Sequence, residues 1–119
     1  RRRKTTMKDN RLYLVHIQEC IAKIEEFTKN GKAEYLSDLK TQDAVIRNLQ
    51  TLCESTQRIP EAWKTAHPEM DWKKMAGFRN VLTHQYLDID IELVWTIVEN
   101  YLPNLKVTIE AIRQEFWNA

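Results

Sequence analysis

The sequence predicts an all-α protein, a bundle of four to five helices, and three observations support this. Apolar residues recur at three- and four-residue spacing along most of the chain. Only two glycines and three prolines occur in 119 residues, too few for the many tight turns of an all-β fold. The composition, with 43% apolar and 29% charged residues, excludes collagen-like and disordered classes.

The length indicates one domain that buries its own core. The residues before Met7 are basic and polar. We therefore predict a basic tail over residues 1–6, disordered or foreign to the native protein, and a single helical domain over residues 7–119. The tail lacks the apolar stretch of a secretory signal, and no apolar run reaches the roughly 20 residues that span a bilayer. We expect a cytoplasmic protein without a membrane segment.

The first half of the chain predicts two long helices and one short one. An apolar stripe predicts the first helix over about residues 9–28, before Asn30-Gly31, with Tyr13, Ile17, Cys20, Ile24 and Phe27 on one face. A second helix over about residues 37–58 carries a similar stripe of Val45, Leu49 and Leu52. Pro60 begins a short turn or helix through Ala66, which His67-Pro68 breaks.

Acidic residues mark the helix starts in the second half. Asp71 is the expected N-cap of a third helix that runs through Arg79 and Leu82, and Asp90 that of a fourth. Pro103 forces a kink or a new helix, whose apolar stripe continues to Phe116. We expect no β-strand of consequence.

The densest cluster of reactive side chains contains Arg79, His84 and Tyr86. A histidine can take the proton from a ribose 2′-hydroxyl, which then attacks the adjacent phosphorus. An arginine can bind the non-bridging oxygens and stabilise the charge of the transition state. Because DNA lacks the 2′-hydroxyl, this chemistry selects RNA. The structural alternative is that Arg79 forms a salt bridge, His84 ends a helix and Tyr86 packs at the edge of the core.

Helix geometry restricts how these residues meet. On one continuous helix, Arg79 and Tyr86 project within about 20° of each other, whereas Arg79 and His84 project about 140° apart. Arg79 and His84 therefore share a site only if the helix ends or distorts between them, or if a symmetric dimer completes the site. Gly77 lies inside the same predicted helix at a cost of about 1 kcal/mol relative to alanine. Close packing against another backbone or a ligand would justify that cost.

The spacing of Arg79, His84 and Tyr86 resembles the signature of the HepT-like toxins of the HEPN superfamily, which is Arg, four residues, His, one residue, Tyr. Residues 40–49 are similar to the family's second helix, and residues 72–80 to its run into the motif. Where the family often has Gly-Glu-Ala, this chain keeps only the glutamate, Glu54. The resemblance covers nearly the whole chain from Met7.

The resemblance implies a HEPN-like helical homodimer whose two motifs face a shared cleft. It implies a metal-independent endoribonuclease toxin of a toxin–antitoxin system, without a cofactor. His84 is the expected general base, Arg79 the phosphate ligand and Tyr86 the residue that orients the phosphate. Accessory roles are expected for Asn80, Glu54 and Lys73. The implied partner is an MntA-type minimal nucleotidyltransferase antitoxin that silences the toxin by transferring AMP to Tyr86.

Other interpretations remain open at this point. The chain is alternatively an inactive HEPN interaction module that binds and regulates a nucleotidyltransferase, or a structural subunit of a helical dimer. His16 and Cys20 have a spacing that can bind metal, and Cys53 is a third candidate, but no fourth ligand is evident. We expect these residues to be buried in the core, with both cysteines reduced and no metal site.

The charge of the chain limits how it can bind RNA. Apart from Arg1–Lys4, the chain has 14 basic and 17 acidic side chains, a net charge of −3. Proteins that grip nucleic acid through many phosphates present a basic face. A nuclease of this composition must instead gather a few cations in one cleft.

Overall fold

The computed structural model describes residues 7–84 and 86–118, with side chains from Asn10 onward except that of Tyr86. The described residues form seven α-helices, one 3-10 helix and no β-strand, which confirms the all-α prediction. The predicted basic tail over residues 1–6 lies outside the described residues. The five longer helices are α1 (Met7–Phe27), α3 (Leu39–Thr56), α5 (Trp72–His84), α6 (Ile91–Asn100) and α7 (Leu102–Phe116). The shorter ones are α2 (Lys32–Ser37), α4 (Glu61–Thr65) and the 3-10 helix η1 (Tyr86–Asp88).

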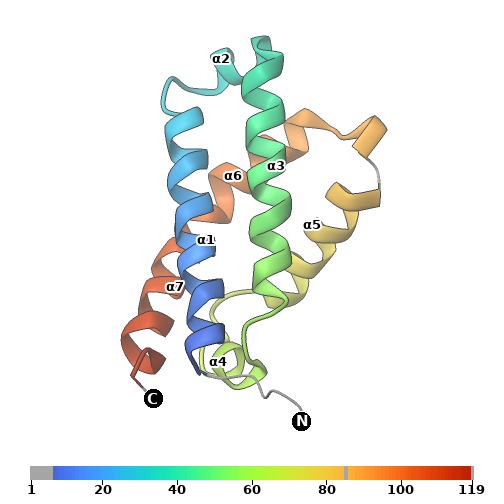
Figure 1. Ribbon diagram of the computed structural model, residues 1–119. Coiled ribbons are helices and arrows are strands. Elements are labelled where there is room, and N and C mark those ends of the chain that lie inside the picture. The colour runs from blue at the N-terminus through green and yellow to red at the C-terminus, as the bar shows by residue number, and fades with distance from the viewer. Residues whose placement is uncertain (1–6, 85, 119) are drawn as a thin grey trace.

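Helices α1 and α3 lie side by side and antiparallel, and they form the centre of the bundle (Figure 1). Helix α5 packs on α3, whereas α7 packs on α1 at the other side of the molecule. Helix α6 contacts α7 and α2. The helix that carries the Arg79–His84 motif is therefore supported mainly by α3.

The apolar stripes predicted from the sequence form the core. Most stripe residues of α1 and α3 are almost or completely inaccessible to solvent, among them Leu14, Ile17, Ile24, Val45, Leu49 and Leu52. Two predicted stripe residues of α1 differ, because Tyr13 is only partly buried and Phe27, in the last turn, is 42% exposed. Both cysteines are buried in the same core. Burial raises the pKa of the Cys53 thiol to about 12, so this thiol stays protonated and behaves as a small hydrophobic group.

Helix α2 and the 3-10 helix η1 were not predicted from the sequence. Helix α2 is the one that packs into the core. It has only six residues, too few to show a helical period, and it lies between Gly31, at φ +97°, and the cap of the next helix. Its buried residue Tyr35 donates a hydrogen bond of 2.8 Å from its hydroxyl to the carbonyl oxygen of Ile91. Helix α3 then begins at Leu39, because the Asp38 carboxylate accepts from the backbone N–H of Lys40.

Both predicted N-caps around the motif helix are confirmed. Asp71 Oδ1 accepts a hydrogen bond of 3.0 Å from the backbone N–H of Lys74, in the first turn of α5. Asp90 Oδ1 accepts from the backbone N–H groups of Glu92, at 2.9 Å, and Leu93, at 3.2 Å. Pro103 lies in the first turn of α7, as expected for a helix that restarts there.

His67 joins the loop between α4 and α5 to the last helix. Its Nδ1 lies 2.9 Å from Glu69 Oε2, and its Nε2 lies 2.8 Å from Glu115 Oε1 on α7. The His67 side chain is only 13% exposed. Its hydrogen bonds to Glu69 and then to Glu115 raise the pKa of His67 above 6.5, although burial opposes this effect.

This contact predicts a stability difference that depends on pH. Because the pKa of His67 is higher in the folded chain than in the unfolded one, its stabilisation is complete below about pH 6.5. It is lost as the pH rises through the folded pKa. We expect His67→Gln to lower the free energy of unfolding by about 1 kcal/mol more at pH 6 than at pH 8.5. Urea unfolding at both pH values measures this, and an equal loss at both would contradict it.

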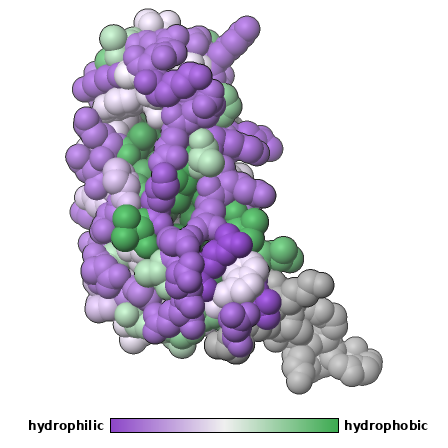
Figure 2. Space-filling model, turned by 90° about the vertical axis from the view of Figure 1, so that its left-hand side faces the viewer, coloured by the Kyte–Doolittle hydropathy of each residue, from purple (hydrophilic) through white to green (hydrophobic). Residues whose placement is uncertain are grey.

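The face formed by α1 and α7 carries a groove. Figure 2 shows this side of the molecule, where hydrophobic side chains lie between hydrophilic ones. The groove has a volume of about 240 Å³ and is bridged by an ion pair of 2.9 Å between Lys106 Nζ and Glu25 Oε2. Among the described residues, no helix has the length and apolar character to cross a bilayer.

Candidate active site

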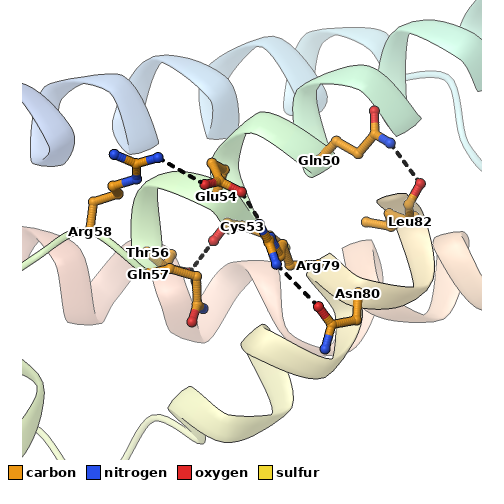
Figure 3. Close-up of polar contacts among 9 residues, drawn as sticks. All are labelled: Gln50, Cys53, Glu54, Thr56, Gln57, Arg58, Arg79, Asn80 and Leu82. Carbon is orange, nitrogen blue, oxygen red and sulfur yellow. Dashed lines mark hydrogen bonds and ion pairs between the residues drawn. The ribbon is translucent and has the colours of Figure 1, made fainter. Parts of the chain in front are cut away.

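Arg79 faces the end of α3 and contacts Glu54 in its last turn. Arg79 Nε donates a hydrogen bond of 2.8 Å to Glu54 Oε1 (Figure 3). The two side chains remain 37% and 40% exposed, so solvent reaches the pair. The Arg79 guanidinium is the main cause that lowers the pKa of the Glu54 carboxyl. Glu54 is thus ionised near neutral pH and holds Arg79 at the surface of the α3–α5 contact.

Asn80 provides the second contact of the Arg79 guanidinium. Arg79 Nη1 donates a hydrogen bond of 3.2 Å to Asn80 Oδ1. With the Glu54 contact, the bonds made among the described side chains use two of the five N–H groups of the guanidinium. The remaining three have the fork geometry that suits a phosphate group.

Arg58 is the fourth member of this cluster, after Arg79, Glu54 and Asn80, and it was not predicted from the sequence. Arg58 Nη2 donates a hydrogen bond of 3.3 Å to Glu54 Oε2, the carboxylate oxygen that Arg79 does not contact. The spacing Glu54 to Arg58 is i, i+4, an ordinary ion-pair spacing at a helix end. That spacing was a usable signal, but it is too common to single out one pair.

Gln50 holds the other end of the motif helix. Its Nε2 donates a hydrogen bond of 2.6 Å to the carbonyl oxygen of Leu82. Leu82 lies in the last turn of α5, where backbone carbonyls have no partner within the helix. Gln50 and Glu54 are four residues apart, so the same face of α3 binds α5 at two points (Figure 3).

His84 is the last residue of α5, and its side chain is exposed. The helix runs without a break from Trp72 to His84, so it neither ends nor distorts between Arg79 and His84. The two side chains therefore project about 140° apart around one axis. Among the described side chains, Arg79 donates hydrogen bonds to Glu54 and Asn80 and none to His84.

His84 shares an exposed stripe of α5 with Lys73, Gly77 and Asn80. These four residues project within about 60° of one another, and each of them is exposed. A Cβ atom added at Gly77 would meet nothing within 4 Å. The expectation that Gly77 packs closely is therefore wrong within this chain, because this side of the helix is open.

Tyr86 begins η1, and its side chain lies outside the described residues, as does all of Gln85. The expected 20° relation between Arg79 and Tyr86 assumed one helix through both residues. It does not hold, because α5 ends at His84. The two residues after Tyr86, Leu87 and Asp88, are exposed.

His16 and Cys20 belong to α1, and their side chains contact α3. Cys20 is buried as expected, whereas the expectation that His16 is buried in the core is wrong, because it is only partly buried. His16 Nδ1 is 2.7 Å from Ser55 Oγ, and its Nε2 is 3.6 Å from Cys20 Sγ. Cys20 Sγ is also 3.4 Å from Thr51 Oγ1. Among the side chains that the structure describes, no three His, Cys, Asp or Glu residues are grouped so that they could hold a metal ion.

Comparisons with known proteins identify the family. Residues 17–112 match the model of the family described as "Ribonuclease HepT-like". The chain is 42% identical to a "Probable ribonuclease HepT" of Thermococcus cleftensis, over 86% of this chain and 94% of that protein. It is 27% identical to an "mRNA nuclease HepT" of Shewanella oneidensis, over 83% of this chain and 92% of that protein. No solved structure matches significantly. The chain belongs to the HepT-like ribonuclease family of the HEPN superfamily.

Proposed function

We propose that this protein is a metal-independent endoribonuclease toxin of a toxin–antitoxin system. The proposal depends mainly on the position and the hydrogen bonds of the Arg79 guanidinium. Glu54 and Asn80 hold its guanidinium at the surface, and three N–H groups are not engaged by the described side chains. His84 is exposed at the end of the same helix. The family relationship supports RNA as the substrate.

In the proposed reaction, an imidazole nitrogen of His84 accepts the proton of a ribose 2′-hydroxyl. The 2′-oxygen then attacks the adjacent phosphorus, and the bond from phosphorus to the 5′-oxygen breaks. The leaving 5′-oxygen takes up a proton from solvent water, and the products carry a 2′,3′-cyclic phosphate and a 5′-hydroxyl. Arg79 binds the non-bridging oxygens and stabilises their charge in the transition state. Histidine suits the proton transfer because it exchanges protons near neutral pH.

A homodimer is part of the proposal, because one chain directs Arg79 and His84 to different sides of α5. A twofold axis near this helix would place the His84 of one protomer opposite the Arg79 of its partner, and the reverse. The open stripe around Gly77 supports this arrangement, since a second helix or an RNA backbone can approach there closely. Tyr86 would orient the phosphate, and Lys73 on the same stripe would attract it.

Purified protein and a defined RNA test this function. We expect cleavage to continue in EDTA and to leave cyclic phosphate ends, detected by mass spectrometry. RNA with 2′-O-methyl groups should remain intact, because its nucleophile is blocked. Loss of cleavage in EDTA, or cleavage of the methylated RNA, would overturn the mechanism. If every RNA stays intact while the protein binds a nucleotidyltransferase, the result would favour the alternative function, an inactive HEPN module that binds and regulates that partner.

The partner that we propose is an MntA-type nucleotidyltransferase that modifies Tyr86. The tyrosine oxygen would attack the α-phosphorus of ATP and release pyrophosphate, leaving AMP on the side chain. The added phosphodiester is an anion close in sequence to Arg79, and an anion bound there would compete with RNA.

We expect the intact mass to increase by one or more AMP groups after incubation with this partner and ATP, and RNA cleavage to fall in parallel. Tyr86→Phe should remain unmodified and should escape the inhibition. Tyr101→Phe is the matched control, since Tyr101 lies at the end of α6. AMP transfer to Tyr86→Phe at the normal level would contradict the assignment.

A further inference from the structure

Glu54 joins two guanidinium groups that come from different parts of the chain. Its Oε1 accepts from Arg79 on α5, and its Oε2 accepts from Arg58, just after α3. Figure 3 shows the carboxylate between the two arginines. Because only two hydrogen bonds and one carboxylate separate them, Arg79 Nε and Arg58 Nη2 are no more than about 8 Å apart.

The backbone at Arg58 is held by a hydrogen bond and by the burial of the next residue. The N–H of Arg58 donates a hydrogen bond of 3.0 Å to the carbonyl oxygen of Ser55. The next residue, Ile59, is only 3% exposed and belongs to the core. The Glu54 carboxylate and then the Tyr13 hydroxyl raise the pKa of Arg58. The Arg58 side chain is nevertheless 57% exposed, so a ligand in solvent can reach it.

The cluster has more positive charge than an ion pair needs. One carboxylate balances one of the two guanidinium groups, which leaves a local charge of +1, whereas residues 5–119 together have a net charge of −3. Each guanidinium donates a hydrogen bond to Glu54 from only one of its nitrogen atoms. Arginine is the preferred ligand for phosphate because its fork can donate two parallel hydrogen bonds.

We infer that Arg58 is a second phosphate-binding residue of the RNA site, which Glu54 holds beside Arg79. This inference rests on the proposed function. Arg79 binds the phosphate that is cleaved, and Arg58 binds another phosphate of the same strand. Arg58 thus adds affinity for the RNA backbone, and Glu54 positions both cations without contacting the substrate.

Arg58→Gln and Lys106→Gln form a matched pair for the test. Each variant removes one positive charge from a cation that pairs with a glutamate, and the two side chains are 57% and 58% exposed. Lys106 lies on α7, at the α1–α7 groove. Fluorescence anisotropy with a 2′-O-methyl RNA measures binding without cleavage, at salt concentrations between 50 and 200 mM.

We expect Arg58→Gln to weaken binding by about fivefold. The slope of log affinity against log salt should become shallower by about 0.7, the value for one phosphate contact on a single strand. In cleavage assays KM should rise by a similar factor, while kcat changes by less than twofold. Lys106→Gln should match the wild type in all four quantities.

Arg58→Lys keeps the charge but loses the fork, so we expect the wild-type salt slope with about threefold weaker binding. This variant decides the question if Arg58→Gln fails to fold. Arg58→Gln that binds and cuts like Lys106→Gln, or Arg58→Lys with wild-type affinity, would overturn the inference and leave the proposed function intact. Wild-type protein that neither binds nor cuts RNA would overturn the proposed function, and the inference with it.

Discussion

Replacing His84 by alanine is expected to lower the rate of RNA cleavage by about 10²–10⁴-fold while the fold remains intact. The loss is large because no other group in the proposed site would take the proton from the 2′-hydroxyl. The fold tolerates the change because His84 is exposed, at the very end of α5. Surface substitutions of this kind change stability by about 0.5 kcal/mol or less. Single-turnover cleavage rates and urea unfolding measure the two effects separately.

His67→Ala is the informative control for His84→Ala. His67 is mostly buried and bridges two glutamates, so its loss should lower stability more than the loss of His84 does. It has no place in the proposed reaction, so its cleavage rate should stay within about twofold of the wild type at a temperature where both are folded. Normal cleavage by a well-folded His84→Ala protein would rule out His84 as the general base.

Mixing two inactive variants is expected to restore cleavage. Arg79→Ala should lose about 10²–10³-fold in rate, since it removes a donor to the transition-state charge. In a dimer of Arg79→Ala with His84→Ala, one site lacks both residues and the other keeps both. Random exchange makes half of the dimers mixed, so the mixture should reach about a quarter of the wild-type activity. The increase requires that each site takes Arg79 from one protomer and His84 from its partner.

The control mixes wild-type protein with the variant that carries both substitutions. Each site of a mixed dimer then lacks either Arg79 or His84, so only the wild-type dimers, about a quarter of the total after random exchange, should cut RNA. If each protomer acted alone, about half of the wild-type activity would remain. Different tags and native mass spectrometry establish that mixed dimers have formed. If they have formed and no cleavage returns, Arg79 and His84 act within one chain, and α5 must then distort on binding RNA.

Glu54 has a double effect on Arg79 that a simple phosphate ligand would lack. It holds the guanidinium in place, yet its negative charge also offsets part of the attraction for phosphate. An exposed ion pair of this kind contributes only about 0.2–1 kcal/mol to stability. The contact is therefore weak enough that a bound phosphate can share the guanidinium.

Most of the fold could be predicted from local signals. The apolar stripes placed α1 and α3, and Asp71, Asp90 and Pro103 marked three helix starts, since caps and prolines act within one turn. Helix α2 was missed because its six residues do not complete two turns, so no period is visible. The expectation of close packing at Gly77 is contradicted within one chain, for a different reason. The cost of glycine in a helix is a local property, but the neighbour that would justify it is not.

The candidate site was only partly visible in the sequence. The spacing of Arg79, His84 and Tyr86 is readable because it is local, and the angle of about 140° between the first two follows from helix geometry alone. The contact of Arg79 with Glu54 crosses 25 positions of the chain. Nothing in their spacing predicts it. Gln50 and Arg58 were overlooked because their roles depend on which face of α3 receives α5.

The sequence by itself determined where most of the longer helices begin, which residues form most of the core and that Arg79 and His84 lie on one helix. These properties depend on interactions between residues that are a few positions apart, so the order of the side chains is sufficient to predict them. The tertiary structure alone decided that α5 lies against α3, that Glu54 binds both Arg79 and Arg58, and that α5 stays unbroken to His84. Packing settles such questions because many distant apolar contacts act together, and no single pair of residues encodes the result.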